Sequence, residues 1–306
     1  MVISRHALLM TSLGLFRVSR PMLTFKFSDQ LASGISMLSL EIAAFLLLAL
    51  ALNLKDVTGV VRGMFPAAFH VNVLCFFVEI LLIVPVLSFL FVALHDNMQF
   101  ISSPLQGVWT DLPKWVVVCS ILVVADGVSY FRHRVEHTRW LWPVHSMHHS
   151  DRAMSWFTLY RQHPLNRLLA LLIDAGILLA IGFPMWALIV NSWIRHYYGL
   201  MTHANVPWTF GPFGRLLVSP AMHRWHHVRE GEGVGSNFAT LFSVFDQLFG
   251  TYYVPAPCRS SVGLNEPGHS SYLQQLWRPF RDVGRGLRRL SSPVGSISPD
   301  KRERIP

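Results

Sequence analysis

The chain has 306 residues, of which 52% are hydrophobic and 14% are charged, and its mean hydropathy is +0.38. This balance is too apolar and too poor in charge for an ordinary soluble domain, and it predicts a membrane protein. The net charge of +9 comes with arginines that flank apolar segments, as on a cytoplasmic membrane face, so we expect no nucleic-acid partner. Three scattered cysteines indicate neither a disulfide framework nor a thiolate metal site.

Apolar runs give the expected membrane segments in chain order. Residues 38–52, 73–94 and 115–131 are long enough to cross a bilayer core, the first only just. A fourth run, 168–190, is broken by Gly-Phe-Pro at 182–184, where proline removes a backbone donor. We expect this run to form a hairpin, because the histidines before and after it must lie on one side of the membrane to share one site.

Charge assigns that side and divides the chain. Arginines crowd the first histidine region, whereas the loop between the second and third spans has almost no positive charge, so the histidines are predicted to be cytoplasmic. We expect an N-terminal segment of unclear topology (1–30), a membrane-embedded domain (31–255) and a basic tail (256–306). Residues 273–290 of the tail fit a helix on an anionic membrane surface or a solvated basic segment, and the last residues are expected to be disordered.

The predicted fold is therefore all-α and integral to the membrane: three spans plus a helical hairpin, capped by a cytoplasmic, helical, histidine-rich metal domain. Histidines recur in that cap with helical spacing, because residues three and four apart point to one side of a helix. So many imidazoles exceed the four ligands of one zinc ion, and they predict a nitrogen-rich centre of two metals. The pattern is His133-x-x-x-His137, His145-x-x-His148-His149, His203, and His223-x-x-His226-His227.

Asp126 and Tyr130 precede the first histidine pair on the same helical stripe, since the spacings are four, three and four. A carboxylate within an apolar run is costly and usually functional. We expect Asp126 to accept the free N–H of a ligating histidine, which would fix the ring. The alternative is a carboxylate that caps a helix or reaches the interface.

Three other interpretations compete with a two-metal site. The His133–His137 pair matches the H-x-x-E-H pattern of a zinc protease with Glu136 as general base, but this leaves the other histidines unexplained, and a salt bridge from Glu136 to an arginine is simpler. Haem needs histidines in mid-span, whereas these cluster at helix ends. A membrane protein that stores or transports zinc stays open, although Asp126 and Glu79 are nearly alone among ionisable residues at membrane depth.

The order of several short motifs is similar to that of the sterol desaturase and fatty acid hydroxylase superfamily. The resemblance extends over residues 38–253 and includes the His-Pro sequence at 163–164 and a closing motif at 245–251. It implies that the nine histidines are metal ligands, with His196 as a tenth candidate because it lies seven residues before His203 on one helix face. Further residues are implied around the ligands, each with a structural role as the alternative: Asp126, Tyr130, His163, Asn205, Asn237 and Asp246.

The resemblance also implies an activity. It predicts a membrane-bound oxygenase with two iron ions that hydroxylates or desaturates an unactivated C–H bond of a fatty acyl, sterol or isoprenoid lipid, using dioxygen. Zinc would be able to replace iron in purified protein. Electrons would come from NAD(P)H through a separate ferredoxin or cytochrome b5 type carrier and its reductase, because the sequence resembles no haem, flavin or iron–sulfur domain.

Overall fold

A computed structural model describes residues 27–52, 69–98, 106–265 and 271–291. Within these ranges the protein is helical, and its β structure is limited to an isolated bridge between Val228 and Val262. The bundle and the tail are formed by α2 (Phe27–Leu52), α4 (Phe69–Val78), the π-helix η2 (Glu79–Ile83), α5 (Val84–Met98), α7 (Lys114–Glu136), α9 (Pro164–Ala170), the π-helix η5 (Leu171–Ala175), α10 (Gly176–Ala180), α11 (Met185–His203) and α14 (Tyr272–Ser291). Short helices are α6 (Gln106–Asp111), α8 (Trp142–His145), η3 (His148–Ser150), η4 (Trp156–Tyr160), η6 (Gly211–Arg215), α12 (Pro220–His226) and α13 (Val244–Leu248).

The three expected spans each lie within a helix. Among the described residues, two helices are long and apolar enough to cross a membrane. They are the continuous helix Phe69–Met98, made of α4, η2 and α5, and the helix Lys114–Glu136, which is α7. The first expected span falls in α2, whose apolar part, Ala32–Leu47, is shorter. The structure therefore supports membrane association through two helices, and a third crossing stays a prediction.

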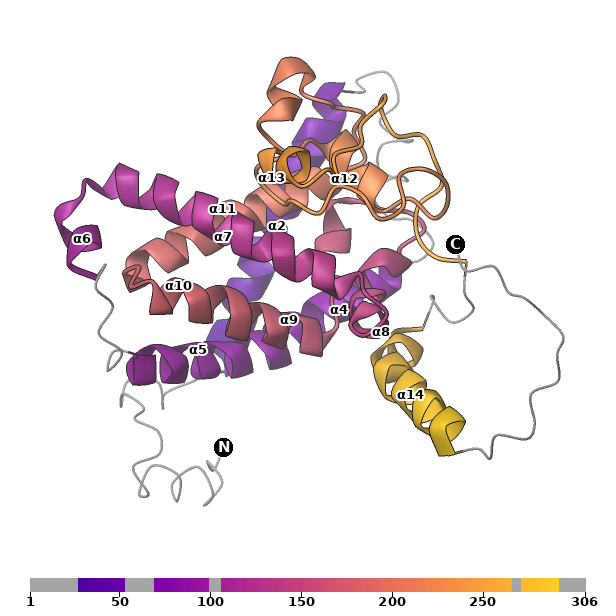
Figure 1. The fold of residues 1–306 in the computed structure, drawn as a ribbon, viewed down its shortest axis with the longest axis horizontal. Coiled ribbons are helices and arrows are strands. Elements are labelled where there is room, and N and C mark those ends of the chain that lie inside the picture. The colour runs from indigo at the N-terminus through magenta and orange to yellow at the C-terminus, as the bar shows by residue number, and fades with distance from the viewer. Residues whose placement is uncertain (1–26, 53–68, 99–105, 266–270, 292–306) are drawn as a thin grey trace, which may run out of the picture.

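The expected hairpin is present. Residues 164–180 form one helical rod of α9, η5 and α10, the chain turns at 181–184, and α11 leads back towards the histidines (Figure 1). Pro184 is suited to this turn because it directly precedes the first residue of α11 and no hydrogen bond is lost there. Buried apolar side chains of α7, α10 and α11 pack together around Ile121, Leu178 and Leu188, which holds the two arms against α7.

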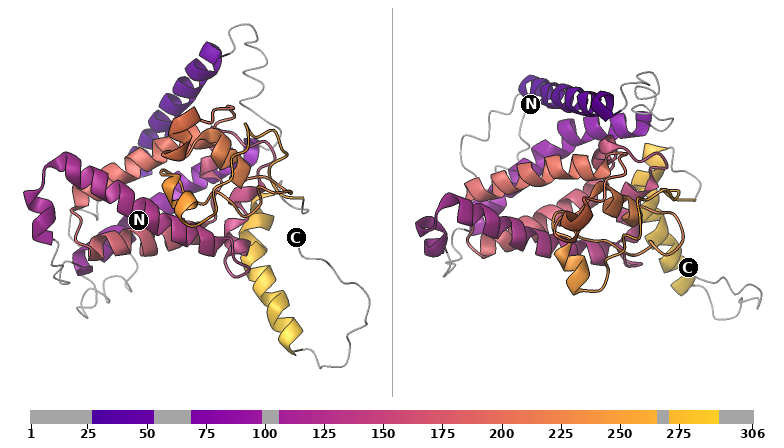
Figure 2. Two further views of the ribbon diagram at one scale, coloured as in Figure 1. Left: turned by 45° about the horizontal axis from the view of Figure 1, so that its top comes forward. Right: turned by 90° about the horizontal axis from the view of Figure 1, so that it is seen from above.

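The histidine-rich cap lies at one end of this bundle. It consists of the segment 137–163 and the largely irregular segment 204–265, which contains α12 and α13. Tyr130 of α7 packs with Met222 and Phe238 and so joins the cap to the bundle. On another side, α2 lies along the outside of the bundle (Figure 2), where Tyr160 of the cap donates its hydroxyl to Glu41.

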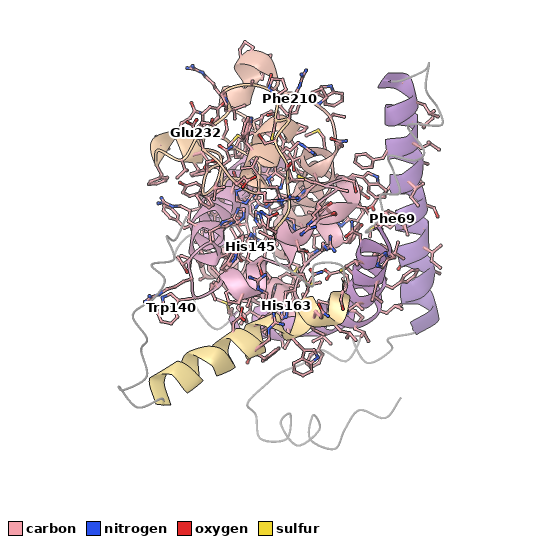
Figure 3. All side chains as sticks on the ribbon, turned by 90° about the vertical axis from the view of Figure 1, so that its right-hand side faces the viewer. Phe69, Trp140, His145, His163, Phe210 and Glu232 are labelled. Carbon is pink, nitrogen blue, oxygen red and sulfur yellow. The ribbon has the colours of Figure 1, made fainter. Side chains whose placement is uncertain are left out.

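Part of the predicted basic tail forms a helix despite Pro279. Helix α14 packs against α4 and α8 near the cap, as the side view shows (Figure 3). Its inner side is fixed by a bond from Ser150 to Gln275, and Leu273, Trp277 and Phe280 are exposed. An exposed apolar stripe on a basic helix agrees with the expected membrane-surface helix. Residues 1–26 and 292–306 lie outside the described residues.

Candidate metal centre

All nine histidines predicted as ligands come together where the ends of α7 and α11 meet the cap, and they form two groups. Within each group, one ring nitrogen per histidine lies within 4.8 Å of the others. Each of the two His-His dipeptides contributes one ring to each group: His149 and His226 belong to the first group, and His148 and His227 belong to the second. The rings of His149 and His227 stack at 4.3 Å, so the groups are neighbours. The first group is His133, His137, His145, His149 and His226; the second is His148, His203, His223 and His227.

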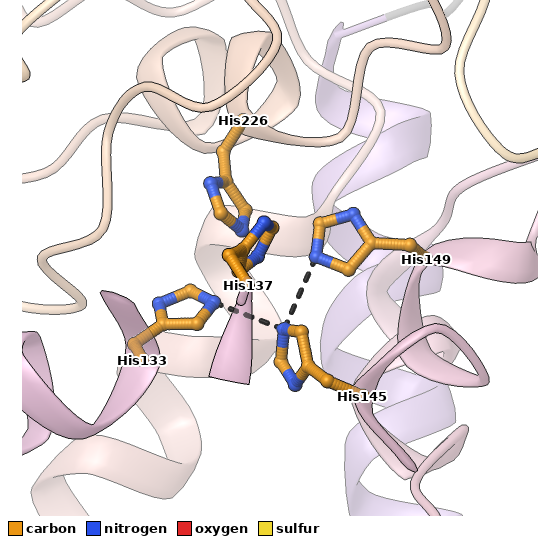
Figure 4. Close-up of side chains that lie close together, drawn as sticks. All are labelled: His133, His137, His145, His149 and His226. Carbon is orange, nitrogen blue, oxygen red and sulfur yellow. Dashed lines mark hydrogen bonds between the residues drawn. The ribbon is translucent and has the colours of Figure 1, made fainter. Parts of the chain in front are cut away.

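In the first group, the ring nitrogens make more contacts with one another than hydrogen bonding explains (Figure 4). Nε2 of His145 lies 3.1 Å from Nε2 of His133 and 3.2 Å from Nε2 of His149. A ring nitrogen carries one proton or one lone pair, so it cannot make both contacts as ordinary hydrogen bonds. Nε2 of His137 and Nε2 of His226 are buried without a hydrogen-bond partner. Nitrogens that converge in this way fit a cation between them.

The second group repeats the arrangement. Nε2 of His203 lies 3.1 Å from Nε2 of His148 and 3.0 Å from Nε2 of His223, which in turn lies 3.2 Å from Nε2 of His227. Here two nitrogens, those of His203 and His223, each contact two others, which excludes a simple network of hydrogen bonds. All four histidines are buried.

Backbone carbonyls fix which nitrogen of three rings can bind a metal. Nδ1 of His133 donates to the carbonyl of Phe238, Nδ1 of His226 to that of Ser236, and Nδ1 of His203 to that of Gly199, each at 2.7 Å. A carbonyl only accepts, so each Nδ1 carries the proton and each Nε2 presents its lone pair to the group. The donor set therefore fits two metal ions held by imidazole nitrogen.

Burial keeps these rings neutral. Desolvation lowers the pKa of His226 and of His203 to about 4, although each ring's bond to a backbone carbonyl raises it. Desolvation, reinforced by neighbouring histidines, lowers the pKa of the other cap histidines outside the spans well below the usual value. Neutral imidazole is the form that binds metal, so no proton needs to be displaced from Nε2 near neutral pH.

Asp126 does not accept from a histidine, which corrects the expected contact. Its carboxylate is fully buried and accepts from Arg195, from the Thr240 hydroxyl, and from the backbone N–H groups of Leu241 and Phe242. It therefore holds the irregular segment that follows Phe238. This segment begins next to the Phe238 carbonyl that accepts from His133. Asp126 therefore supports the His133 ring indirectly, through the backbone, and not by the direct contact that was expected.

Asp246, Asn237 and Tyr130 support the same segment. Asp246 accepts from the N–H groups of Phe238 and Ala239. Asn237 has a φ of 60°, and its side chain bonds three backbone groups, including the N–H of Tyr253 at 2.8 Å. Tyr130 bonds the Thr251 hydroxyl. Each of these predicted residues lies next to the backbone that orients a histidine.

Three predicted residues lie elsewhere. Nε2 of His196 is 2.9 Å from Glu41 on α2, and His196 belongs to neither group. His163 caps α9 by accepting from Leu165, and its other nitrogen bonds the carbonyl of Leu276 on α14. Asn205 is exposed. His196 thus joins α11 to α2, and His163 joins the cap to α14.

Sequence reasoning missed two neighbours of the ligands. Glu136 pairs with Arg132, as the simpler alternative held, but its other oxygen also lies 3.4 Å from Nδ1 of His145. Gln162 contacts Nδ1 of His148 at 3.0 Å. In the sequence, the spacing of four residues between Arg132 and Glu136 indicated only their salt bridge. Gln162 lies alone between an arginine and a histidine, and no sequence pattern marked it as a neighbour of a metal ligand.

A cavity of about 740 Å³ reaches both histidine groups. It is bounded by α5, α7, the rod 164–180 and α11. His133 and His145 of the first group line it, as do three histidines of the second. Its volume lies in the range of small-molecule sites. The cavity therefore gives a ligand access to both groups from within the helical bundle.

With this geometry in place, comparison with known proteins identifies the domain. The sequence profile of the fatty acid hydroxylase family matches residues 118–251, which include all nine clustered histidines. Residues 118–251 belong to the fatty acid hydroxylase family. This confirms the resemblance to the sterol desaturase and fatty acid hydroxylase superfamily. No solved structure matches the chain.

Curated relatives of this fatty acid hydroxylase domain are enzymes of lipid metabolism. Ornithine lipid hydroxylase OlsE of Rhizobium tropici is 29% identical over 58% of this chain and 54% of its own length. Alkylglycerol monooxygenase of Caenorhabditis elegans is 27% identical over 54% of this chain and 31% of its own. Very-long-chain aldehyde decarbonylase GL1-8 of Oryza sativa is 32% identical over 46% of this chain and 54% of its own. The chain thus matches about half or less of each relative.

Proposed function

We propose that the protein is a membrane-bound, non-haem di-iron oxygenase that hydroxylates or desaturates a C–H bond of a lipid. The observation that carries this proposal is the convergence of nine imidazoles in two groups at the end of a bundle cavity. Relatives that are a lipid hydroxylase and a monooxygenase support the reaction class. The family is generally iron-dependent, which supports iron over zinc.

Each group would hold one iron ion through Nε2 of its histidines. The pair of ions would supply the activation of dioxygen and the removal of hydrogen from carbon. An imidazole-only set favours no hard cation such as Mg²⁺ or Ca²⁺, which select oxygen ligands. The fixed protons on Nδ1 of His133, His203 and His226 would keep those rings in one orientation during turnover.

The residues around the cavity would bind and orient the lipid. Apolar side chains of α5, α10 and α11 line its far part, including Phe91, Leu178 and Leu188, so a hydrocarbon chain entering there would displace water. The chain would then present a carbon to the histidine end. A cavity open to a lipid chain is not needed to store zinc, and this feature favours the oxygenase over the zinc-binding alternative.

Electrons would reach the site from NAD(P)H through a separate ferredoxin or cytochrome b5 type carrier. Exposed arginines lie close to the histidines, at position 134 on α7 and at positions 139 and 152 in the cap. A basic surface would steer an acidic carrier to this face. The same charge would keep the cap on the cytoplasmic side, as the positive-inside rule requires.

The experiment that tests the proposal combines metal analysis with lipid turnover. Iron-grown protein should contain two metals per chain and should form oxidised lipid when supplied with dioxygen and a reduced carrier. His226→Ala removes a nitrogen from the first group and His148→Ala one from the second, so each should lose metal and abolish turnover. His70→Ala, an exposed histidine outside both groups, is the matched control and should retain both.

Two results would contradict the proposal. A single metal per chain that survives His226→Ala would favour a mononuclear site of the protease kind. Two firmly bound zinc ions, with no lipid product from iron-loaded protein, would favour the zinc-storing alternative.

A further inference from the structure

The outer face of α7 carries an exposed apolar stripe. Val123 and Phe131 are both 49% exposed, and Gly127 lies between them with a spacing of four residues on each side. Residues four apart lie within about 40° of each other around a helix, so these three share one side of α7. Because α7 is long and apolar enough to cross a membrane, this side would face lipid.

Helix α13 of the cap lies directly on this stripe. A Cβ on Gly127 would be only 3.1 Å from the ring of Phe245, so the close approach of α13 requires a glycine there. One turn further along α7, the rings of Phe131 and Phe249 meet edge to face, with their centroids 4.9 Å apart. The cap thus covers α7 at two residues that belong to the apolar span.

These contacts give the depth of α13. The apolar run 115–131 of α7 ends where Arg132 and Arg134 begin, so the boundary of the hydrocarbon core is expected near Phe131. Gly127 lies four residues before Phe131, which corresponds to about 6 Å along the helix axis. Helices that lie in the bilayer interface bury their apolar face by about 5 to 10 Å. Helix α13 is therefore at the depth of an interfacial helix.

Helix η6 extends the same surface. The side chains of Gln247 and Ser243 donate to the backbone carbonyls of Arg215 and Gly214, so η6 and the start of α13 are fixed side by side. Their outward side chains are apolar: Phe213 is 71% exposed and Leu248 is 70% exposed. Together with α7 they form one apolar cap surface, which consists of Phe131, Phe213, Leu216, Leu248 and Phe249.

The charges around this surface suit a lipid boundary. Residues 206–217 and 244–251 contain one acid, Asp246, and its carboxylate is buried against the backbone of the cap. They contain one basic residue, Arg215, and it is exposed. An arginine beside apolar side chains can keep its stem in the acyl region and extend its guanidinium to lipid phosphate. A large exposed apolar surface without exposed acids fits an anionic bilayer better than water.

We propose that η6 and α13 lie in the bilayer interface, with the apolar cap surface against acyl chains and Arg215 at the phosphates of anionic phospholipids. The cap then rests partly within the leaflet on this side. Because α13 carries Asp246, the bilayer also supports the backbone segment next to His133. This position requires only that α7 crosses the membrane, and it does not depend on the proposed oxygenase activity.

Spin labels measure the depth of the surface in protein reconstituted into nanodiscs. Native Cys119 is exposed within the span of α7 and provides the lipid reference, since Cys75 and Cys258 are buried. In a Cys119→Ser background, labels are placed at Phe213→Cys, at Leu248→Cys and, as the aqueous control, at the exposed Glu230→Cys. Labels at 213 and 248 should collide with dissolved oxygen much more than with a water-soluble nickel chelate, as at Cys119, whereas the label at 230 should do the reverse.

Two results would overturn the proposal. Labels at 213 and 248 that meet the nickel chelate as freely as the label at 230 would mean that this surface faces water. Labels shielded from both reagents, with dipolar broadening that disappears on dilution with unlabelled protein, would mean that a second copy of the chain covers it. Circular dichroism of each labelled variant shows whether it has kept its helical fold.

The role of Arg215 is tested by the lipid headgroup. The unfolding temperature is measured in nanodiscs of phosphatidylcholine alone and in nanodiscs that also contain phosphatidylglycerol. The anionic bilayer should raise it, and Arg215→Gln should lose part of that gain. Arg259→Gln, at an exposed arginine outside the apolar cap surface, is the matched control and should keep the gain. Equal gains in both variants would show that Arg215 does not reach the headgroups.

Discussion

Asp126 of α7 and Asp246 of α13 bind successive parts of one irregular segment. Asp246 accepts from the N–H groups of Phe238 and Ala239, and Asp126 accepts from those of Leu241 and Phe242. The two carboxylates satisfy backbone groups that have no helix or sheet to pair with. The carbonyl of Phe238, at the start of this segment, accepts from His133. The first metal group thus depends on two buried acids that do not touch it.

Asp246→Asn is predicted to weaken this support. An amide presents one oxygen where the carboxylate uses two, so at least one backbone N–H loses its acceptor, at a cost of about 1 to 3 kcal/mol. The unfolding temperature should fall, and iron should dissociate faster from the first group. Asp111→Asn, an exposed acid on α6, provides the comparison and should change neither measurement. Equal stability of both variants would show that the segment is held in another way.

Glu136→Gln tests whether the carboxylate near His145 matters to the metal. The carboxylate lies 3.4 Å from Nδ1 of His145, and a carboxylate in that position orients the ring and makes its other nitrogen more basic. We expect metal affinity to fall by about 10- to 100-fold, as for other outer partners of metal-binding histidines. Competition with a chelator measures it.

Arg132 also bonds Glu136, so loss of that ion pair must be separated from loss of the histidine contact. Arg132→Gln removes the pair, together with the bonds from Arg132 to Asp174, while keeping the carboxylate next to His145. Asp174→Asn shows how much of any loss comes from the Asp174 bonds. If Arg132→Gln lowers metal affinity as much as Glu136→Gln does, the role of Glu136 is to anchor the helix and the predicted contact to His145 is unimportant.

The sequence was sufficient to predict the helices and the nine clustered histidines. Apolar runs have a length that a bilayer or a bundle imposes, and histidines at i, i+3 and i+4 share a helix face. The sequence did not predict how the histidines divide into two groups. His148 and His149 are adjacent in a 3-10 turn, yet they belong to different groups. Local spacing does not describe such a turn, and the assignment depends on contacts with α11 and α12.

Outer contacts were harder to predict for a different reason. Asp126 has the helix position expected for a partner of a histidine, but the segment 238–242 occupies its oxygens. His196 shares a face with His203, yet the buried Glu41 of α2 lies closer to it. In both cases the partner comes from a segment more than a hundred residues away in the sequence. The spacing of residues within one helix cannot predict such a contact.

His196→Phe is predicted to leave the metal content at the wild-type value. The ring belongs to neither histidine group, and its Nε2 faces Glu41 at 2.9 Å. Removing it leaves a buried carboxylate with one partner fewer, so the unfolding temperature should fall as α2 is held less firmly. The double variant His196→Phe with Glu41→Leu should recover part of that loss. A loss of metal in His196→Phe would restore His196 as a tenth ligand.

Acid is predicted to destabilise the metal-free protein. His203 and His226 have a pKa of about 4 in the folded protein, against about 6.5 in an unfolded chain. Between these values the unfolded chain binds protons that the folded protein excludes. The free energy of unfolding should therefore be constant above about pH 7 and fall as the pH drops below it, by up to about 1.4 kcal/mol per pH unit for each buried histidine.

Urea unfolding of chelator-treated protein in detergent, followed between about pH 7.5 and pH 5, measures this slope. His226→Gln removes one of the buried titrating rings and should make the slope shallower. Bound metal would oppose protonation, so metal-loaded protein should keep its stability to lower pH. A free energy of unfolding that does not change over this range would mean that the cap histidines are not kept neutral by burial.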